Sequence, residues 1–117
     1  MQAPVLVVDD DAGIRTMIRE VLEDEGYPVL TAADGRAALE RIVEQTPALV
    51  LLDLQMPVMS GPEVLARLRE LDPPPPVVVM SAGLEARREA ERLRANGYLE
   101  KPFDIELLVQ MVERFGG

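Results

Sequence analysis

The stretch VLVVDDDAG, residues 5–13, places three consecutive aspartates directly after four branched apolar residues. A short, continuous apolar run is typical of a strand that is buried on both faces, as in a parallel sheet. Carboxylates repel one another and resist leaving water, so a cluster of them at the end of a buried strand requires a compensating charge. That charge has to come from elsewhere in the chain or from a bound cation.

The rest of the chain alternates between strand and helix patterns. Residues 48–52 and 77–80 form two more continuous apolar runs, and the weaker candidates 29–32 and 98–100 suit edge strands. Between the runs, apolar residues at helical spacing predict five helices, with Val43 in the core stripe of the second and Ile105 in that of the last. With right-handed crossovers, this rhythm predicts one α/β domain over residues 1–117: a doubly wound five-stranded parallel sheet with five helices.

Capping residues support these boundaries. Side chains that can accept a backbone N–H precede the first, second, third and last helices: Asp11, Asp34, Ser60 and Asp104. The segment 84–95 is the least regular helix, with alanines 86 and 90 and Leu93 on its apolar side. The four prolines at 73–76 are interpreted as a rigid connector, the alternative being a polyproline II ligand for an aromatic groove.

Composition excludes several classes of function. The 117 residues are 48% hydrophobic and 28% charged, which indicates an ordinary globular domain. Cysteine and histidine are absent, which excludes thiol nucleophiles, Cys/His zinc sites, Ser-His-Asp triads and phosphohistidine carriers. A net charge of −9 disfavours direct binding of nucleic acid or of an anionic membrane and favours a multivalent cation. Without a membrane-spanning run or a signal peptide, the chain is predicted to be cytoplasmic.

Polar residues follow the predicted strands at one edge of the sheet. Ligands of a doubly wound sheet bind beyond the carboxyl ends of the strands, where the strand order reverses. If the order is 2-1-3-4-5, Asp9 and Asp10 after the first strand meet Asp53 after the third. Ser81 and Lys101 follow the next two strands, and Lys101 is the one lysine in a chain with eleven arginines. A lone lysine held by a following proline suggests a charge placed for an oxyanion.

These residue types together describe a site for phosphoryl transfer. Clustered carboxylates without histidine or cysteine favour Mg²⁺, with Mn²⁺ or Ca²⁺ as alternatives. A carboxylate can be the nucleophile and form an acyl phosphate. Asp53 suits this role, because it stands alone at a central strand while Asp9 and Asp10 supply charge for the metal. Asp11 is interpreted as the N-cap of the helix that follows.

The chain resembles the receiver domains of bacterial two-component response regulators over nearly its whole length. The motifs that carry the resemblance occur in order: VVDDD at 7–11, LLDLQMPVMSGPE at 51–63, VVMSA at 78–82 and YLEKPF at 98–103. The resemblance implies a flavodoxin-like fold with strand order 2-1-3-4-5. It also implies that Asp53 accepts a phosphoryl group from a sensor histidine kinase, a phosphotransfer protein or a small acyl phosphate.

The resemblance also implies roles for the other residues at the sheet edge. Asp10, Asp53 and the backbone carbonyl of Gln55 would ligate Mg²⁺, with Asp9 acting mainly through water. The residues expected to contact the phosphoryl oxygens are Ser81, Ala82 and Lys101. Ser81 and Tyr98 would form the switch, and the bond between Lys101 and Pro102 is expected to be cis.

The expected output is a change in binding to a downstream target or effector domain, or a phosphorylation-dependent homodimer. The region between Ser81 and Lys101 is two residues shorter than is usual in the family, and Arg94 stands where a helix-ending glycine is common. The sequence leaves open whether this is a stand-alone protein or a domain of a longer one. It is expected to catalyse only its own phosphorylation and dephosphorylation. The alternatives are a Mg²⁺-dependent aspartyl-nucleophile phosphohydrolase and a degenerate receiver that serves as a binding scaffold.

Overall fold

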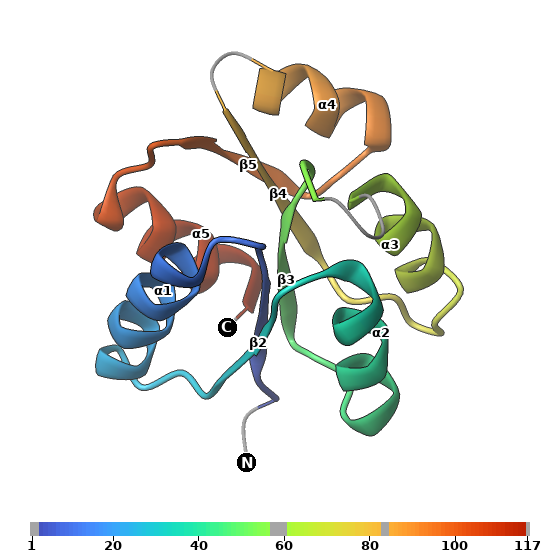
Figure 1. Ribbon diagram of the computed structural model, residues 1–117, viewed down its shortest axis with the longest axis horizontal. Helices are drawn as coiled ribbons and strands as arrows, with labels where there is room; N and C mark the ends of the chain where they lie inside the picture. Colours follow the sequence, from blue (N-terminus) through green and yellow to red (C-terminus); the bar gives the residue numbers. More distant parts are fainter. Residues whose placement is uncertain (1–2, 57–60, 83–84, 117) are drawn as a thin grey trace.

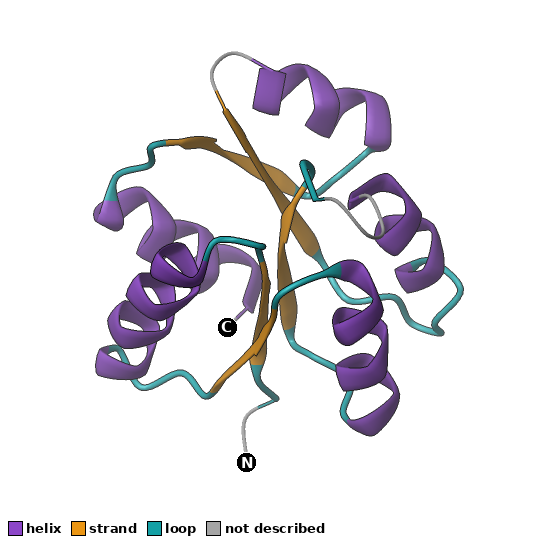
Figure 2. Ribbon diagram, viewed as in Figure 1, coloured by secondary structure: helices purple, strands orange, loops and turns teal. Residues whose placement is uncertain are grey.

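The computed structural model describes residues 3–56, 61–82 and 85–116. Strands and helices alternate along these ranges (Figure 1; Figure 2). The strands are β1 (Val5–Val8), β2 (Val29–Ala32), β3 (Leu49–Asp53), β4 (Val77–Ala82) and β5 (Gly97–Lys101). The helices are α1 (Ala12–Asp24), α2 (Gly35–Glu44), α3 (Gly61–Leu68), α4 (Glu85–Leu93) and α5 (Ile105–Gly116).

All five strands form one parallel sheet in the order β2-β1-β3-β4-β5, which confirms the predicted topology. The three continuous apolar runs became the central strands β1, β3 and β4, and the two weaker candidates lie at the edges. β1 pairs with β2 on one side and with β3 on the other. The order therefore reverses between β1 and β3, the place where such sheets bind ligands.

Helices cover both faces of the sheet (Figure 1). Helices α1 and α5 pack on one face, where Val5 and Val7 of β1 lie, while α2, α3 and α4 pack on the other with Leu6 and Val8. Successive side chains of a strand point to opposite faces, so burial of both faces explains the continuous apolar runs. In the described ranges, no helix combines the length and apolar character needed to cross a bilayer.

Three of the predicted caps are present. The Asp11 carboxylate accepts two N–H groups of the first turn of α1, at 2.8 and 3.2 Å, and Asp34 accepts one from α2 at 2.8 Å. Asp104 accepts one from α5, also at 2.8 Å. Such caps satisfy donors that the helix itself leaves unpaired, and each contributes about 1 kcal/mol. Ser60, the fourth predicted cap, lies outside the described residues.

Two residues assigned to the core by periodicity are exposed, and for them the prediction was wrong. Val43 is 88% exposed and Ile105 is 50% exposed. Val43 is the penultimate residue of α2, whose buried side is the narrower stripe of Ala38 and Ile42. Ile105 is the first residue of α5, which buries Leu108 and Val112 further along. A helical stripe predicts the side that faces the core but not how far along its length the sheet covers it.

Helix α4 ends earlier than the predicted segment, at Leu93. Its buried residues are Ala86 and Ala90, as predicted. The next residue, Arg94, has a positive φ of 57° and occupies the left-handed region in which helices end. The guanidinium of Arg69 donates hydrogen bonds to the carbonyls of Leu93 and Arg94, so a side chain just beyond α3 satisfies the end of α4.

Gly61 at the start of α3 touches the strand that carries Asp53. A Cβ at this position would lie 2.7 Å from Cα of Leu54 and 2.8 Å from the carbonyl oxygen of Asp53, both backbone atoms. We expect Gly61→Ala to lower the free energy of unfolding by about 1–3 kcal/mol, since backbone must move to admit the methyl group. Urea denaturation measures this loss, and unchanged stability would contradict the close approach.

Candidate functional site

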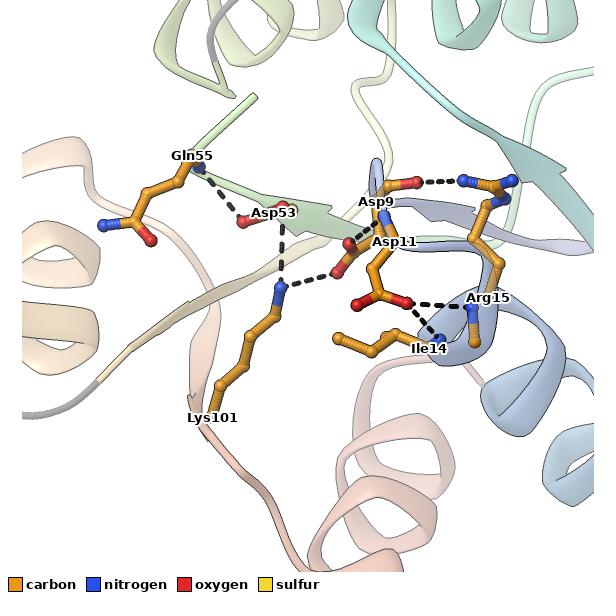
Figure 3. Close-up of polar contacts among 8 residues, drawn as sticks. Asp9, Asp11, Ile14, Arg15, Asp53, Gln55 and Lys101 are labelled. Atoms are coloured by element: carbon orange, nitrogen blue, oxygen red, sulfur yellow. Dashed lines mark hydrogen bonds and ion pairs between the residues drawn. The ribbon is translucent and has the colours of Figure 1, made fainter. Parts of the chain in front are cut away.

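The carboxyl ends of β1, β3 and β5 bring acidic and basic side chains together (Figure 3). Asp9 directly follows β1, while Asp53 and Lys101 are the last residues of β3 and β5. Asp9 is completely buried and Asp53 is 2% exposed. Buried carboxylates are stable only when they are paired, hydrogen-bonded or protonated, so this strand end concentrates unfavourable charge.

Lys101 supplies the opposite charge inside the protein. Its Nζ lies 2.7 Å from Oδ2 of Asp9 and 3.5 Å from Oδ2 of Asp53, with its side chain 20% exposed (Figure 3). One ammonium thus serves two carboxylates and is closer to Asp9. One positive charge cannot neutralise two carboxylates, so Asp9, Asp53 and Lys101 together retain a net negative charge when both aspartates are ionised.

Backbone N–H groups hold the other oxygen of each buried carboxylate. Asp11 N–H donates to Oδ1 of Asp9 at 2.9 Å, and Gln55 N–H donates to Oδ1 of Asp53 at 3.0 Å. In both cases the donor lies two residues further along, so the chain turns sharply after the strand and the side chain accepts from that turn. Both carboxylates are therefore fixed in direction.

Burial acts in opposite directions on the pKa values of Asp53 and Lys101. Burial raises the pKa of Asp53 from 3.8 to about 6; the Gln55 N–H lowers it, the Asp9 charge raises it and Lys101 lowers it. Burial alone would lower the pKa of Lys101, but hydrogen bonding to Asp9 and the charges of both aspartates outweigh burial and raise it. Lys101 therefore stays protonated at neutral pH, while Asp53 is ionised there at a cost in stability.

This cost leads to a prediction for the metal-free protein. The pKa of Asp53 is about 6 in the folded protein and 3.8 in the unfolded chain. This difference lowers the free energy of unfolding by about 3 kcal/mol above pH 6. Asp53→Asn removes the buried charge and also its ion pair with Lys101, so we expect it to raise the free energy of unfolding by about 2 kcal/mol at pH 7.5.

The sign of the pH dependence follows from the same shift. Asp53 binds a proton more tightly in the folded protein than in the unfolded chain. The free energy of unfolding therefore rises as pH falls through about 6. The advantage of Asp53→Asn should accordingly shrink toward zero near pH 4. Urea denaturation in EDTA at several pH values measures it, with Glu20→Gln as an exposed charge control. A pH-independent difference would contradict the assignment.

The acidic cluster of Asp9, Asp10 and Asp53 fits a divalent cation. One carboxylate oxygen from each residue lies within 4.8 Å of the others, near enough for one ion to contact all three directly or through water. Among the described residues, Oδ2 of Asp9 is a buried carboxylate oxygen that faces the Lys101 ammonium at 2.7 Å and accepts no further hydrogen bond. Oxygen donors and surplus negative charge are what Mg²⁺ requires.

The three consecutive aspartates differ in environment. Asp9 is buried against Lys101, Asp10 is the exposed member of the cluster, and Asp11 caps α1. The side chain of Asp11 points into the first turn of its helix, as the sequence predicts. The run DDD therefore divides into one buried acid, one outward-facing acid and one helix cap.

The other predicted site residues lie around this cluster without joining it. Ser81 is buried near the end of β4, and Ala82 is exposed and pairs in register with Lys101. Tyr98 is half-buried on β5, against the core on the side of α2, α3 and α4. Within the described ranges, Asp53 contacts Gln55 and Lys101 rather than Ser81. The bond between Lys101 and Pro102 is cis, and so is that between residues 72 and 73.

Two contacts at the site were not predicted from the sequence. Arg15 of α1 donates from Nη1 to the backbone carbonyl oxygen of Asp9 at 2.8 Å, and Gly61 packs on the backbone of Asp53. Arg15 lies three and seven residues before the buried Ile18 and Leu22, so helical spacing puts it on the side facing the protein. An arginine on that side was the signal that could have indicated an internal partner.

Comparison with known proteins identifies relatives of the chain. Residues 5–113 match the family model described as "Response regulator receiver domain". Sporulation initiation phosphotransferase F of Bacillus subtilis (strain 168) is 38% identical, with 98% of this chain and 94% of that protein covered. The DNA-binding transcriptional regulator NtrC of Escherichia coli (strain K12) is also 38% identical, but the match covers 94% of this chain and only 24% of NtrC.

A solved structure agrees with this match. Chemotaxis protein CheY4 of Vibrio cholerae superimposes with a TM-score of 0.87 at 35% sequence identity, with 98% of this chain and 99% of that chain covered. The match therefore covers nearly all of the solved CheY4 chain and about a quarter of the NtrC sequence.

Proposed function

The chain belongs to the response regulator receiver domain family, and we propose that Asp53 is the residue on which it accepts a phosphoryl group. Receiver domains act in phosphorylation-dependent two-component signalling, generally use Mg²⁺ at an acidic cluster, and work with histidine kinases and effector domains. The observation that carries the proposal is the position of Asp53 at the end of the central strand β3, beside Lys101 and the other two acids of the cluster.

The contacts of Asp53 support one of its oxygens as the nucleophile. Oδ1 accepts the Gln55 N–H, whereas Oδ2 is held more loosely, 3.5 Å from Nζ of Lys101. In the proposed step, Oδ2 attacks the phosphorus of the donor and forms a phosphorus–oxygen bond. The bond between phosphorus and the donor's nitrogen or acyl oxygen breaks, and the leaving group departs with its electron pair.

The remaining site residues would manage charge during this step. We propose that Asp9, Asp10, Asp53 and the Gln55 carbonyl hold Mg²⁺, with Asp9 acting through water. Bound there, Mg²⁺ would neutralise carboxylate and phosphoryl oxygens as they approach one another. Lys101, protonated and already between two carboxylates, would pair with a phosphoryl oxygen after transfer. Ser81 and Ala82 at the end of β4 would contact the others.

We propose that phosphorylation of Asp53 acts as a signal by changing what the chain binds. The added phosphoryl group carries about −1.5 to −2 charges and new acceptor oxygens. Ser81 and Tyr98 would respond to it and change binding to a downstream target, an effector domain or a second copy of the chain. The donor would be a sensor histidine kinase or a phosphotransfer protein in the cytoplasm.

We also propose that the chain catalyses only its own phosphorylation and dephosphorylation. The raised pKa of Lys101 keeps it as an ammonium, so it cannot act as a general base at neutral pH. Gln55, two residues after Asp53, carries an amide that does not ionise near neutral pH and so cannot act as a general acid or base. These properties support a single phosphoryl transfer rather than turnover of phosphate esters.

Intact-mass analysis with a small acyl phosphate tests the proposal. With Mg²⁺, we expect one phosphoryl adduct per chain, labile to hydroxylamine, and with EDTA we expect none. Multiple turnovers of a phosphate ester, assayed separately, would instead indicate a phosphohydrolase, because phosphate release from the acyl phosphate also follows from repeated phosphorylation and dephosphorylation of Asp53. Failure to bind Mg²⁺ and to form an adduct would favour a degenerate receiver that acts as a scaffold.

A further inference from the structure

Arg15 turns back from α1 toward the acidic end of β1 (Figure 3). It lies in the first turn of the helix, is half-buried, and its Nη1 donates to the carbonyl oxygen of Asp9 at 2.8 Å. Arg19, one turn further along, differs in its exposure and in its partner. Its side chain is 54% exposed and pairs with Glu23 on the surface of the same helix.

The bond from Arg15 completes the contacts of Asp9. The Asp9 N–H donates to the Ala32 carbonyl at 3.1 Å, and the carboxylate is held by the Asp11 N–H and by Lys101. The Asp9 carbonyl and the Asp10 N–H belong to one planar peptide unit. Arg15 holds that carbonyl, and Oδ1 of Asp9 holds the Asp11 N–H, so the peptide units on both sides of Asp10 are held and with them the direction in which its side chain leaves the backbone.

We propose that Arg15 is a positioning residue for the cation site. It holds the peptide between the two consecutive acids so that Asp9 points inward and Asp10 keeps its place in the cluster. This inference rests on the proposed function, because it assumes that the acidic cluster binds Mg²⁺. Partners that orient metal ligands from outside typically change affinity by about 10- to 100-fold.

The positive charge of Arg15 opposes Mg²⁺ binding, whereas its positioning role favours it. The direction in which the affinity changes when Arg15 is removed therefore distinguishes the two effects. A positive group near the site repels a cation, so charge alone predicts tighter Mg²⁺ binding once Arg15 is removed. Arg15 is partly solvated, and solvent and salt screen this repulsion. Orientation of the peptide unit is not screened, so we expect the loss of positioning to exceed the relief of repulsion.

The test compares two arginines of one helix. Arg15→Met and Arg19→Met each remove one charge from α1 and keep a long unbranched side chain with good helix propensity. Calorimetric titration with MgCl₂ at pH 7.5 should show about tenfold weaker binding for Arg15→Met and a change within about twofold for Arg19→Met. The loss should persist when the salt concentration is raised, since an effect of charge would shrink.

Each outcome decides between the possibilities. Unchanged or tighter binding in Arg15→Met, or a loss that disappears at high salt, overturns the positioning role while leaving the proposed function intact. A native chain that does not bind Mg²⁺ overturns both. If Arg15→Met does not fold, Arg15→Gln, which is too short to reach the Asp9 carbonyl, should show the same loss. Native-like affinity in that variant would also refute the inference.

Discussion

Asp53→Asn is expected to abolish the phosphoryl adduct completely. The amide has nearly the shape of the carboxylate and its oxygen can still accept the Gln55 N–H, which Oδ1 accepts at 3.0 Å in the native chain. An amide oxygen is a far weaker nucleophile than a carboxylate, so the chemistry is lost while the fold is kept. Intact mass after incubation with Mg²⁺ and an acyl phosphate measures the loss.

Another aspartate provides the matched control for this experiment. Asp34→Asn makes the same chemical change at the N-cap of α2, where asparagine also caps well, so its adduct should form as in the native chain. Asp53→Asn should in addition be folded and, without metal, more stable than the native chain at pH 7.5. An adduct that survives in Asp53→Asn would show that the phosphoryl group is carried by a different residue.

The second large effect concerns the two neighbouring acids of the first loop. We expect Asp10→Asn to weaken Mg²⁺ binding by about 100-fold, because it removes a charged oxygen from the cluster that spans only 4.8 Å. Among the cluster residues described, Asp10 is the exposed one, and it is free of the ion pairs with Lys101 that occupy Asp9 and Asp53. Calorimetric titration with MgCl₂ measures the affinity.

Asp11→Asn is the control, since it removes the same charge one residue away. Its carboxylate accepts two N–H groups of α1 instead of facing the cluster, and asparagine is an equally good cap. Its affinity for Mg²⁺ should therefore fall by no more than about threefold, the effect of losing a nearby screened charge. Equal losses in the two variants would mean that total charge, rather than ligand geometry, governs binding.

Ser81 and Tyr98, the proposed switch residues, differ in their position in the sheet. Ser81 is buried at the end of β4, next to the strand that carries Asp53, and Tyr98 is half-buried on edge strand β5. A half-buried aromatic on an edge strand can change its exposure without disturbing the central sheet. This position supports Tyr98 as the residue that reports the state of the site to a partner.

Much of the fold was predictable because its determinants are local. Continuous apolar runs distinguished the central strands from the edge strands, and the capping aspartates at 11, 34 and 104 marked helix starts. Parallel strands bring their carboxyl ends to one edge, so the residues that follow them gather there whatever the details of packing. For this reason Asp9, Asp53 and Lys101 could be assigned to one site from their places in the chain.

Which atoms meet, and at what distance, depends on how the folded segments pack against one another. Lys101 lies 2.7 Å from Asp9 and 3.5 Å from Asp53, and this asymmetry leaves Asp53 the freer carboxylate. Arg15 donates to the Asp9 carbonyl, and Gly61 touches the backbone of Asp53. Sequence patterns do not specify either contact, because each depends on how a helix is placed against the sheet. The exposure of Val43 likewise depends on where the sheet ends beneath α2.

The aspartates of residues 9–11 show the division most clearly. A buried strand that ends in three acids, the last of which begins a helix, is predictable from the order of the residues alone. The different environments of Asp9 and Asp10 depend on side chains of β5 and α1. Lys101 lies against Asp9, and Arg15 donates to the peptide that leads to Asp10. Charge and periodicity are properties of the chain, whereas burial and pairing arise only when distant segments pack together.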